Sequence, residues 1–190
     1  MTLGGTGNAY SILIQDQTVS VSDLLTIDGI TTTTVNAKNI RTLTGSYSNI
    51  ISAYSSETAG TISGLGSNCN FNISGSITVS EANTLSAIIT SNNRNLTATI
   101  SNGDMATLAG ISESGHNLSI TITDTSVAAA ALNALDGKTT VAINANAITT
   151  LSGSAADLIT TYTANSNGSI SGLGNEAVNV NSGTASTSQA

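Results

Sequence analysis

Two patterns of apolar and polar positions alternate along this chain. The first consists of short runs rich in β-branched and apolar residues, which predict half-buried β-strands. Most of these runs begin about 20 residues apart, and the widest interval lies between the second and the third. The runs are SILI at Ser11, TTTTV at Thr31, SITV at Ser76, LTATI at Leu96, LSITI at Leu118 and TTVAI at Thr139.

The second pattern lies between these runs and places apolar residues three positions apart, which predicts one or two helical turns. SEA at Ser80 and NGD at Asn102 offer N-cap acceptors. Asp-Gly at Asp28 and Asp136 and Ser-Gly at Ser152 offer helix stops. Additional helices are predicted in the wide interval and its later counterpart, at SYSNIISAY (46–54) and SAADLITTY (154–162). The threefold sets are Ala37, Ile40 and Leu43; Ala82, Leu85 and Ile88; Met105, Leu108 and Ile111; and Leu132 and Leu135.

The chain also matches itself, without a gap, when it is laid over itself with Ser11 on Ser119, which we call the long-repeat alignment. An ungapped register with matched Gly, Asp and Tyr is not expected by chance, even in a chain rich in Ser and Thr. Such self-similarity is the signature of a repeat architecture. The matched segments are 11–32 over 119–140, 35–46 over 143–154, Tyr54 over Tyr162, and GTISGLG at Gly60 over GSISGLG at Gly168.

A strand and a short helix every 20 or so residues cannot bury their own apolar faces, whereas stacked units can. The sequence therefore predicts an α/β-solenoid, with short parallel strands on one face and short helices on the other. The alternative is an all-β solenoid, in which the threefold spacing marks corners; the AAAA run at 128–131 favours helix. We expect one continuous solenoid with a tail or preceding coil at 1–9, a first long repeat at 10–117, and a second, incomplete repeat at 118–190.

Composition supports a thin folded chain without a nucleic-acid partner. Hydrophobic residues make up 39%, with one Phe and no Trp, so small aliphatic side chains must fill the core. Charged residues make up only 8%, and the net charge is −7. A polyanion binds phosphates poorly, and no apolar run approaches the roughly 20 residues that span a bilayer. The fixed cations are Lys38, Arg41, Arg94 and Lys138.

Catalytic chemistry has little raw material in this chain. The single histidine, His116, lies in ESGHNLS and is predicted to be a surface turn residue. The single cysteine, Cys69, alternates with apolar residues in CNFNI and is predicted to be a buried strand position. No nucleophile elbow, phosphate-binding loop, dinucleotide fingerprint or zinc spacing is present. We therefore expect a protein that is not an enzyme and that has no cofactor.

Four aspartates recur with the long repeat and are the only candidate metal ligands. Asp16 returns as Asp124, and Asp28 returns as Asp136. Carboxylates held in repeating loops could bind Ca²⁺ together with backbone carbonyls. The glycine-rich calcium nonapeptide and the EF-hand loop are both absent. Helix capping at Asp16 and Asp124 and a turn at each Asp-Gly are therefore the preferred interpretation, and calcium is the alternative.

The segments ITDTSVAAAALNALDGKTT, ISGLGNEAV and ITVSEANTLSAI resemble tandem repeats of very long secreted and surface proteins of bacteria, especially cyanobacteria. Similar repeats occur in long phage structural proteins. The resemblance implies an extracellular or cell-surface structural or adhesive role, often linked to calcium. The first functional hypothesis is a structural module of a filament, surface layer or matrix fibre, assembling with copies of itself through solenoid ends and strand edges. The second is an adhesin module that binds surface glycans.

Overall fold

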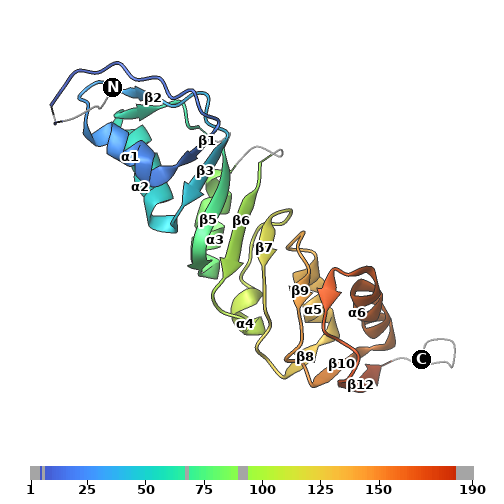
Figure 1. Ribbon diagram of the computed structural model, residues 1–190. Helices are drawn as coiled ribbons and strands as arrows, with labels where there is room; N and C mark the ends of the chain where they lie inside the picture. The colour runs from blue at the N-terminus through green and yellow to red at the C-terminus, as the bar shows by residue number, and fades with distance from the viewer. Residues whose placement is uncertain (1–4, 6, 67–68, 90–93, 183–190) are drawn as a thin grey trace. The chain divides into compact units, whose positions relative to one another are not determined.

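The computed structural model describes residues 5, 7–66, 69–89 and 94–182. In these residues the chain is a mixed α/β protein with six helices and twelve short strands (Figure 1). All the strand pairings with a defined register are parallel. The chain forms two compact units, Met1–Gly75 with Thr84–Ala98, and Ser76–Asn83 with Thr99–Ala190. Each unit is described below by itself.

The first unit contains two small parallel sheets. In the larger one, β3 (Thr42–Gly45) pairs with β1 (Thr18–Ser20) on one side and with β5 (Asn70–Ile77) on the other. In the smaller one, β2 (Val35–Asn36) pairs with β4 (Ile62–Ser63), and isolated bridges join the segment 8–13 to residues 31 and 36. The chain's earliest strands therefore lie at one edge of each sheet. The register of the larger sheet aligns Val19, Leu43 and Phe71 in one buried row.

Two helices pack side by side against these strands, α1 (Val21–Gly29) and α2 (Tyr47–Ala59) (Figure 1). Helix α2 begins where the hydroxyl of Ser46 accepts a hydrogen bond from the amide of Asn49, at 3.3 Å. It ends at Gly60, whose φ of 83° is left-handed and suits a residue without a side chain. Leu24, Ile50 and the neighbouring strand residues are fully buried and form the core of this unit.

Strand β6 (Leu96–Ile100) runs along the other side of β5. The Phe71 amide donates to the Asn95 carbonyl at 2.9 Å, and the Asn95 amide donates to the side chain of Asn70 at 2.9 Å. Helix α3 (Val79–Ile88) connects β5 to β6 and buries Leu85 completely. The outer edge of β5 is therefore covered by the next strand of the chain.

The second unit repeats this arrangement of two parallel sheets and two helices, here α5 (Ala129–Asp136) and α6 (Ala155–Asn167), and it also contains the short helix α4 (Met105–Leu108). One sheet has the order β12, β10, β8, and the other pairs β9 with β11. Val127, Leu151 and Val178 form the apolar row that corresponds to Val19, Leu43 and Phe71. The elements are α4 (Met105–Leu108), β7 (Asn117–Ser119), β8 (Ser126–Ala128), α5 (Ala129–Asp136), β9 (Ile143–Asn144), β10 (Thr150–Ser154), α6 (Ala155–Asn167), β11 (Ile170–Ser171) and β12 (Ala177–Ser182).

The pairing register departs from the ungapped long-repeat alignment near the end of the second unit. Thr42 pairs with Asn70, and the alignment places Val178 over Asn70. The counterpart of Thr42, Thr150, pairs instead with Ala177, one position earlier. The residues that pair on neighbouring strands are more than 20 positions apart in the sequence, which is farther than the spacing of about 20 residues predicted from the β-rich runs. The reason is that a whole helix and a corner lie between successive strands. The paired residues are Thr18, Thr42 and Asn70 in the first unit and Ser126, Thr150 and Ala177 in the second.

One predicted helix is wrong, and the alternative interpretation explains it. Ala37, Ile40 and Leu43 are fully buried, but they form a corner and the start of β3. The Asn36 side chain accepts from the Lys38 amide at 3.2 Å, and the Ile40 amide donates to the Ala37 carbonyl at 3.0 Å. An Asx-type turn places apolar residues three apart on the inside of a corner as well as a helix does.

The other threefold sets do fall on helices. Helices α3, α4 and α5 all form where they were predicted, although Ile111 lies beyond the end of α4. The additional helices, α2 and α6, form as well.

Two of the predicted helix boundaries are wrong. The hydroxyl of Thr78 caps α3 by accepting from the Glu81 amide at 3.2 Å, while Glu81 accepts from the Thr78 amide at 2.8 Å. Ser80 is therefore inside this helix. Ser152 lies in β10 and ends no helix.

Among the predicted strands, only LTATI at Leu96 matches its element fully, as β6. The runs at Thr31, Leu118 and Thr139 overlap short strands and isolated bridges. In SILI at Ser11 only Leu13 forms a bridge, and in SITV at Ser76 the strand ends at Ile77. β-branched residues fit a pleated surface, but strand length is set by how many partners lie opposite.

Candidate functional site

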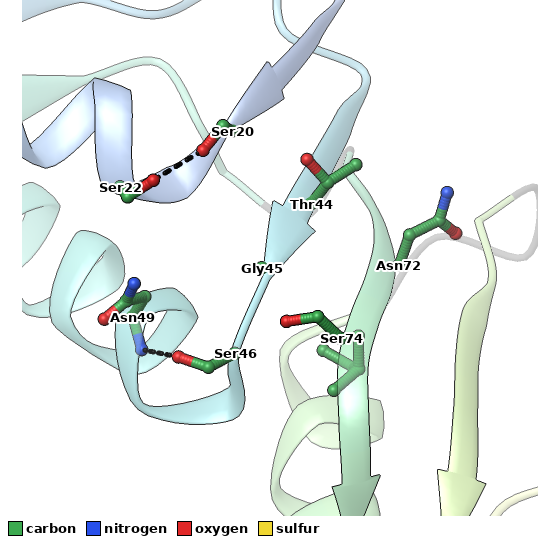
Figure 2. A pocket seen from close by; sticks show the side chains of 9 residues that line it. Ser20, Ser22, Thr44, Gly45, Ser46, Asn49, Asn72 and Ser74 are labelled. Atoms are coloured by element: carbon green, nitrogen blue, oxygen red, sulfur yellow. Dashed lines mark hydrogen bonds between the residues drawn. The ribbon is translucent and has the colours of Figure 1, made fainter.

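The first unit has a polar hollow of about 510 Å³ at the carboxyl ends of β1 and β3, beside β5 (Figure 2). Helices α1 and α2 begin at this edge because each comes directly after its strand. Parallel strands bring their carboxyl ends to one edge, which is where open α/β sheets often bind ligands. The residues that line the hollow are Ser20, Ser22, Thr44, Gly45, Ser46, Asn49, Asn72, Ile73 and Ser74.

The lining is polar but carries no charged side chain. The hydroxyls of Ser20 and Ser22 lie 2.7 Å apart, and the hydroxyl of Ser46 caps α2 (Figure 2). Ser20 stands at the N-cap of α1 but makes no side-chain cap hydrogen bond. Hydroxyl and amide groups can both donate and accept, so this surface is suited to a neutral molecule with many hydroxyls. The lining lacks the acids, bases and thiols that hydrolytic or group-transfer chemistry requires.

The corresponding region of the second unit has different chemistry. In the long-repeat alignment, Ala128 and Ala130 replace the two serines at positions 20 and 22, so two hydroxyls are lost. Asn49 becomes Asp157, which accepts at 2.6 Å from the hydroxyl of Ser154, the N-cap of α6. The uncharged hydroxyl cluster is therefore a property of the first unit and not a requirement of the repeated fold.

The first pair among the four candidate calcium ligands is Asp16 and Asp124. Asp124 accepts a hydrogen bond at 2.6 Å from the amide of Met105, the first residue of α4. It therefore contacts an earlier part of the chain, and not helix α5, which comes after it and was the expected target of its cap. Its counterpart Asp16 is exposed, and no hydrogen bond is described for it.

Asp28 and Asp136 make the same contact in the two units. Asp28 accepts from the hydroxyl of Thr61 at 3.0 Å, and Asp136 accepts from the hydroxyl of Ser169 at 3.0 Å. Each bond ties the end of one helix to the residue after the glycine that ends the next helix. The second carboxylate oxygen of Asp28 is buried and accepts no hydrogen bond from the described residues.

No group of three or more His, Cys, Asp or Glu side chains that could hold a metal ion occurs in the described part of the chain. The structure therefore brings none of the four aspartates into such a group. Calcium binding at Asp16, Asp124, Asp28 and Asp136 remains a prediction.

His116 is buried, with 7% of its surface exposed, so its assignment to a surface turn is wrong. Its backbone forms a bridge with Thr139, and its carbonyl accepts from the Thr140 amide at 2.9 Å, which draws the residue into the unit. Burial disfavours the charged imidazolium and lowers the pKa of His116, against the opposing effect of Glu113.

Cys69 is fully buried directly before β5, which confirms its predicted burial. Its thiol lies 3.6 Å from the carbonyl oxygen of Leu65. Burial raises the pKa of the Cys69 thiol, so the reactive thiolate is disfavoured.

Sequence reasoning missed how the ISGLG turn is held in each unit. In the first unit the Gly66 amide donates to Glu57 at 2.9 Å, and the Tyr54 hydroxyl donates to the Gly66 carbonyl at 2.8 Å. The ring of Tyr54 also meets Phe71 edge to face, with ring centroids 5.7 Å apart. Burial is the main cause that raises the pKa of Tyr54. The sequence did contain one sign of this arrangement: the long-repeat alignment places a Tyr, Tyr54 or Tyr162, before each of the two turns.

In the second unit a different carboxylate takes this role. Glu176 accepts from the amides of Gly174 at 2.7 Å and Asn175 at 3.0 Å, and from the hydroxyl of Tyr162. Burial opposes ionisation of Glu176, but these hydrogen bonds outweigh it and hold the pKa of the carboxyl below its usual value.

Across the described segments, no helix combines the length and the apolar character needed to cross a bilayer. Comparison of the chain with models of known protein families, with curated proteins and with solved structures finds no match. A function must therefore be inferred from the geometry of this chain alone.

Proposed function

We propose that this chain is a non-enzymatic structural repeat module of an extracellular filament, surface layer or matrix fibre. The observation that carries the proposal is the duplicated architecture: β1, α1, β2, β3, α2, β4 and β5 of the first unit correspond in order to β8, α5, β9, β10, α6, β11 and β12 of the second. The parallel registers and the Asp-to-hydroxyl bonds are duplicated as well. In this proposal the strand–helix units stack as an α/β-solenoid, in which each unit buries its neighbour's apolar face.

A structural role also fits the distribution of polar chemistry. The carboxylates of Asp28, Asp124 and Asp136 accept hydrogen bonds that tie segments of the fold together. The hollow offers no charged side chain for acid–base work. Stacked parallel strands leave hydrogen-bonding groups at the two ends of an array, which favours further stacking.

Electron microscopy of the purified chain tests this proposal. We expect filaments, sheets or bundles that grow with protein concentration. Particles that remain monomeric at every concentration would contradict it. A second measurement, turnover of glycoside and ester substrates, should give no rate above that of buffer; sustained turnover would refute the non-enzymatic part of the proposal.

The alternative function is an adhesin module that binds neutral glycans, and the hydroxyl-lined hollow specifically favours it. The double substitution Ser20→Ala and Ser22→Ala tests it, because the second unit already folds with Ala128 and Ala130 at these positions. Binding on a glycan array should fall at least about tenfold, the loss expected when polar contacts worth about 1.4 kcal/mol disappear.

The matched control is Ser55→Ala, which removes an exposed hydroxyl from α2 that donates to the Ile51 carbonyl at 2.9 Å and does not line the hollow. This variant should bind as the native chain does. The array should be probed both with calcium and with a chelator, because the recurring aspartates predict a calcium-dependent form. A blank array under both conditions would eliminate the adhesin alternative.

A further inference from the structure

Strand β12 exposes an apolar position that its counterpart in the first unit buries. By pairing register, Val178 occupies the place of Phe71, since Leu151 pairs with Val178 as Leu43 pairs with Phe71. Phe71 is fully buried, whereas Val178 is 44% exposed. Val180, which corresponds to the half-buried Ile73, is 46% exposed.

The two strands differ in the partner at their outer edge. The outer edge of β5 receives β6, through the bond from the Phe71 amide to the Asn95 carbonyl. Within the described residues, β10 is the only strand that pairs with β12. The sequence of β12, AVNVNS, contains no charged residue or proline of the kind that protects an exposed strand edge.

A complementary edge lies in the earliest segment of the chain. Strand β1 pairs with β3 alone among the described strands, and the segment 8–13 forms the outer edge of the smaller sheet. Leu13 in this segment is 40% exposed. In the second unit the residues just before β8, the counterpart of β1, bond to an earlier part of the chain: the Thr123 amide donates to the Gly103 carbonyl at 3.0 Å, and Asp124 accepts from Met105.

We propose that a second copy of this chain binds head to tail, with its N-terminal edge, residues 8–20, against β12 of the first copy. This inference rests on the proposed structural function and names its partner and its surfaces. Val19 of the incoming copy would extend the row of Val127, Leu151 and Val178, so that both the apolar row and the parallel ladder continue from copy to copy. Because the two surfaces differ, the contact is heterologous and does not close at a dimer.

Sedimentation velocity of the full chain over a concentration series tests the proposal with two blocking variants. Val178→Lys with Val180→Lys blocks the β12 surface, and Leu13→Lys blocks the N-terminal edge. Each variant alone should remain at the 18.9 kDa monomer mass at concentrations where the native chain grows beyond a dimer. Its apparent dissociation constant should rise at least about tenfold.

An equal mixture of the two variants is the decisive sample. Each retains the surface that the other lacks, so the mixture should form a one-to-one dimer that grows no further. Val141→Lys is the matched control, because Val141 is 38% exposed in the second unit and lies outside β12. This control should assemble as the native chain does.

Val178→Asn with Val180→Asn provides a second blocking variant, since Asn already occupies positions 179 and 181 of the strand. Far-UV circular dichroism and melting temperature confirm that each variant is folded. Assembly of both β12 variants at native strength would overturn this inference and leave the structural function standing. If Leu13→Lys forms dimers by itself, and mixing it with the β12 variant produces no further association, the contact is symmetric pairing of two β12 strands and not head to tail. A native chain that stays monomeric would overturn both proposals.

Discussion

Gly64 in the first ISGLG turn and Gly60 at the end of α2 allow a prediction that separates the cost of backbone conformation from the cost of a steric clash. Gly64 has a φ of 88°, and a Cβ atom built there would lie 2.9 Å from both the Cα and the amide nitrogen of Lys38. Gly60 has a nearly equal φ of 83°, but no atom lies within 4 Å of its Cβ position. Substitution of either by Ala therefore has the same backbone cost, and only Gly64→Ala adds a clash with main chain.

The magnitudes follow from these distances. A non-glycine residue in a left-handed conformation costs about 1–2 kcal/mol, so Gly60→Ala should reduce the free energy of unfolding by about that much. Overpacking against atoms that cannot rotate away adds about 1–3 kcal/mol, so Gly64→Ala should cost about 2–5 kcal/mol in total. That is a large part of the roughly 5–15 kcal/mol that stabilises a typical protein.

Urea unfolding followed by circular dichroism measures both variants against the native chain. The second unit provides a replicate, because Gly172 has a φ of 91° and a Cβ position 2.9 Å from the Asn146 amide nitrogen, whereas Gly168 has open space. Equal losses for Gly60→Ala and Gly64→Ala would refute this reasoning, since the close approach to Lys38 would then have no energetic consequence.

Three further predictions concern single side chains. Asp124→Ala should lower the free energy of unfolding by about 1–2 kcal/mol, because the Met105 amide loses its acceptor, whereas Asp16→Ala should change it by less than about 0.5 kcal/mol. Equal losses for the two variants in urea unfolding would contradict the hydrogen bond between Met105 and Asp124. The pKa of His116 is lowered in the folded state, so the unfolded chain binds the proton more readily, and the stability of the fold should fall as pH drops below about 6.5. The melting temperature should therefore decline between pH 7.5 and 5.5, and it should decline less in His116→Gln; an equal decline in both proteins would exclude this residue as the cause. Cys69 should react with a thiol reagent only as fast as the protein opens, and a rate in native buffer equal to that in urea would contradict its burial.

The two helices predicted at 46–54 and 154–162 form as α2 and α6, and the structure shows that good capping supports both. Ser46 and Ser154 each provide an N-cap hydroxyl, and the glycines at 60 and 168 provide the left-handed ends, so α2 and α6 form with equal lengths. Where spacing stood alone, at Ala37, Ile40 and Leu43, the prediction failed, because a corner buries the same positions. The hydrogen bond from the Lys38 amide to the Asn36 side chain stabilises the turn there in place of a helix. In the second unit the Asn146 amide makes the corresponding bond to the Asn144 side chain at 3.1 Å.

The hollow and the buried histidine were beyond the reach of the sequence for a different reason. Ser20 and Ser46 are ordinary polar residues where β1 and β3 end, and Asn72 lies within β5, so only the parallel register brings the three together. His116 is surrounded by polar neighbours in ESGHNLS, which indicates a surface loop. Its burial comes from pairing with Thr139, a contact between distant segments that local sequence cannot specify.

The one-residue change of register near the second ISGLG turn has the largest consequence for function. The long-repeat alignment places Gly66 over Gly174, but the paired strands begin at Asn70 and Ala177, so the second connection is one residue shorter. Side chains alternate between the two faces of a strand, so the ungapped alignment would put Asn179 where Phe71 lies. The shorter connection instead puts a valine there, at position 178.

A different acceptor accompanies the shorter connection. Glu57 reaches the first turn from α2, but the residue that matches it in the second unit is Asn165, whose side chain accepts from the Leu173 amide at 3.4 Å. Glu176, directly before β12, supplies the carboxylate that binds the amides of the second turn. The register of β12, and with it the apolar character of the surface that we propose for assembly, therefore follows from one deleted residue and one relocated glutamate. The ungapped alignment shows the lost glutamate, because Asn165 lies over Glu57, but it does not show the one-residue gap, because the short Ser-, Thr- and Asn-rich segment after the second turn can be aligned in either register.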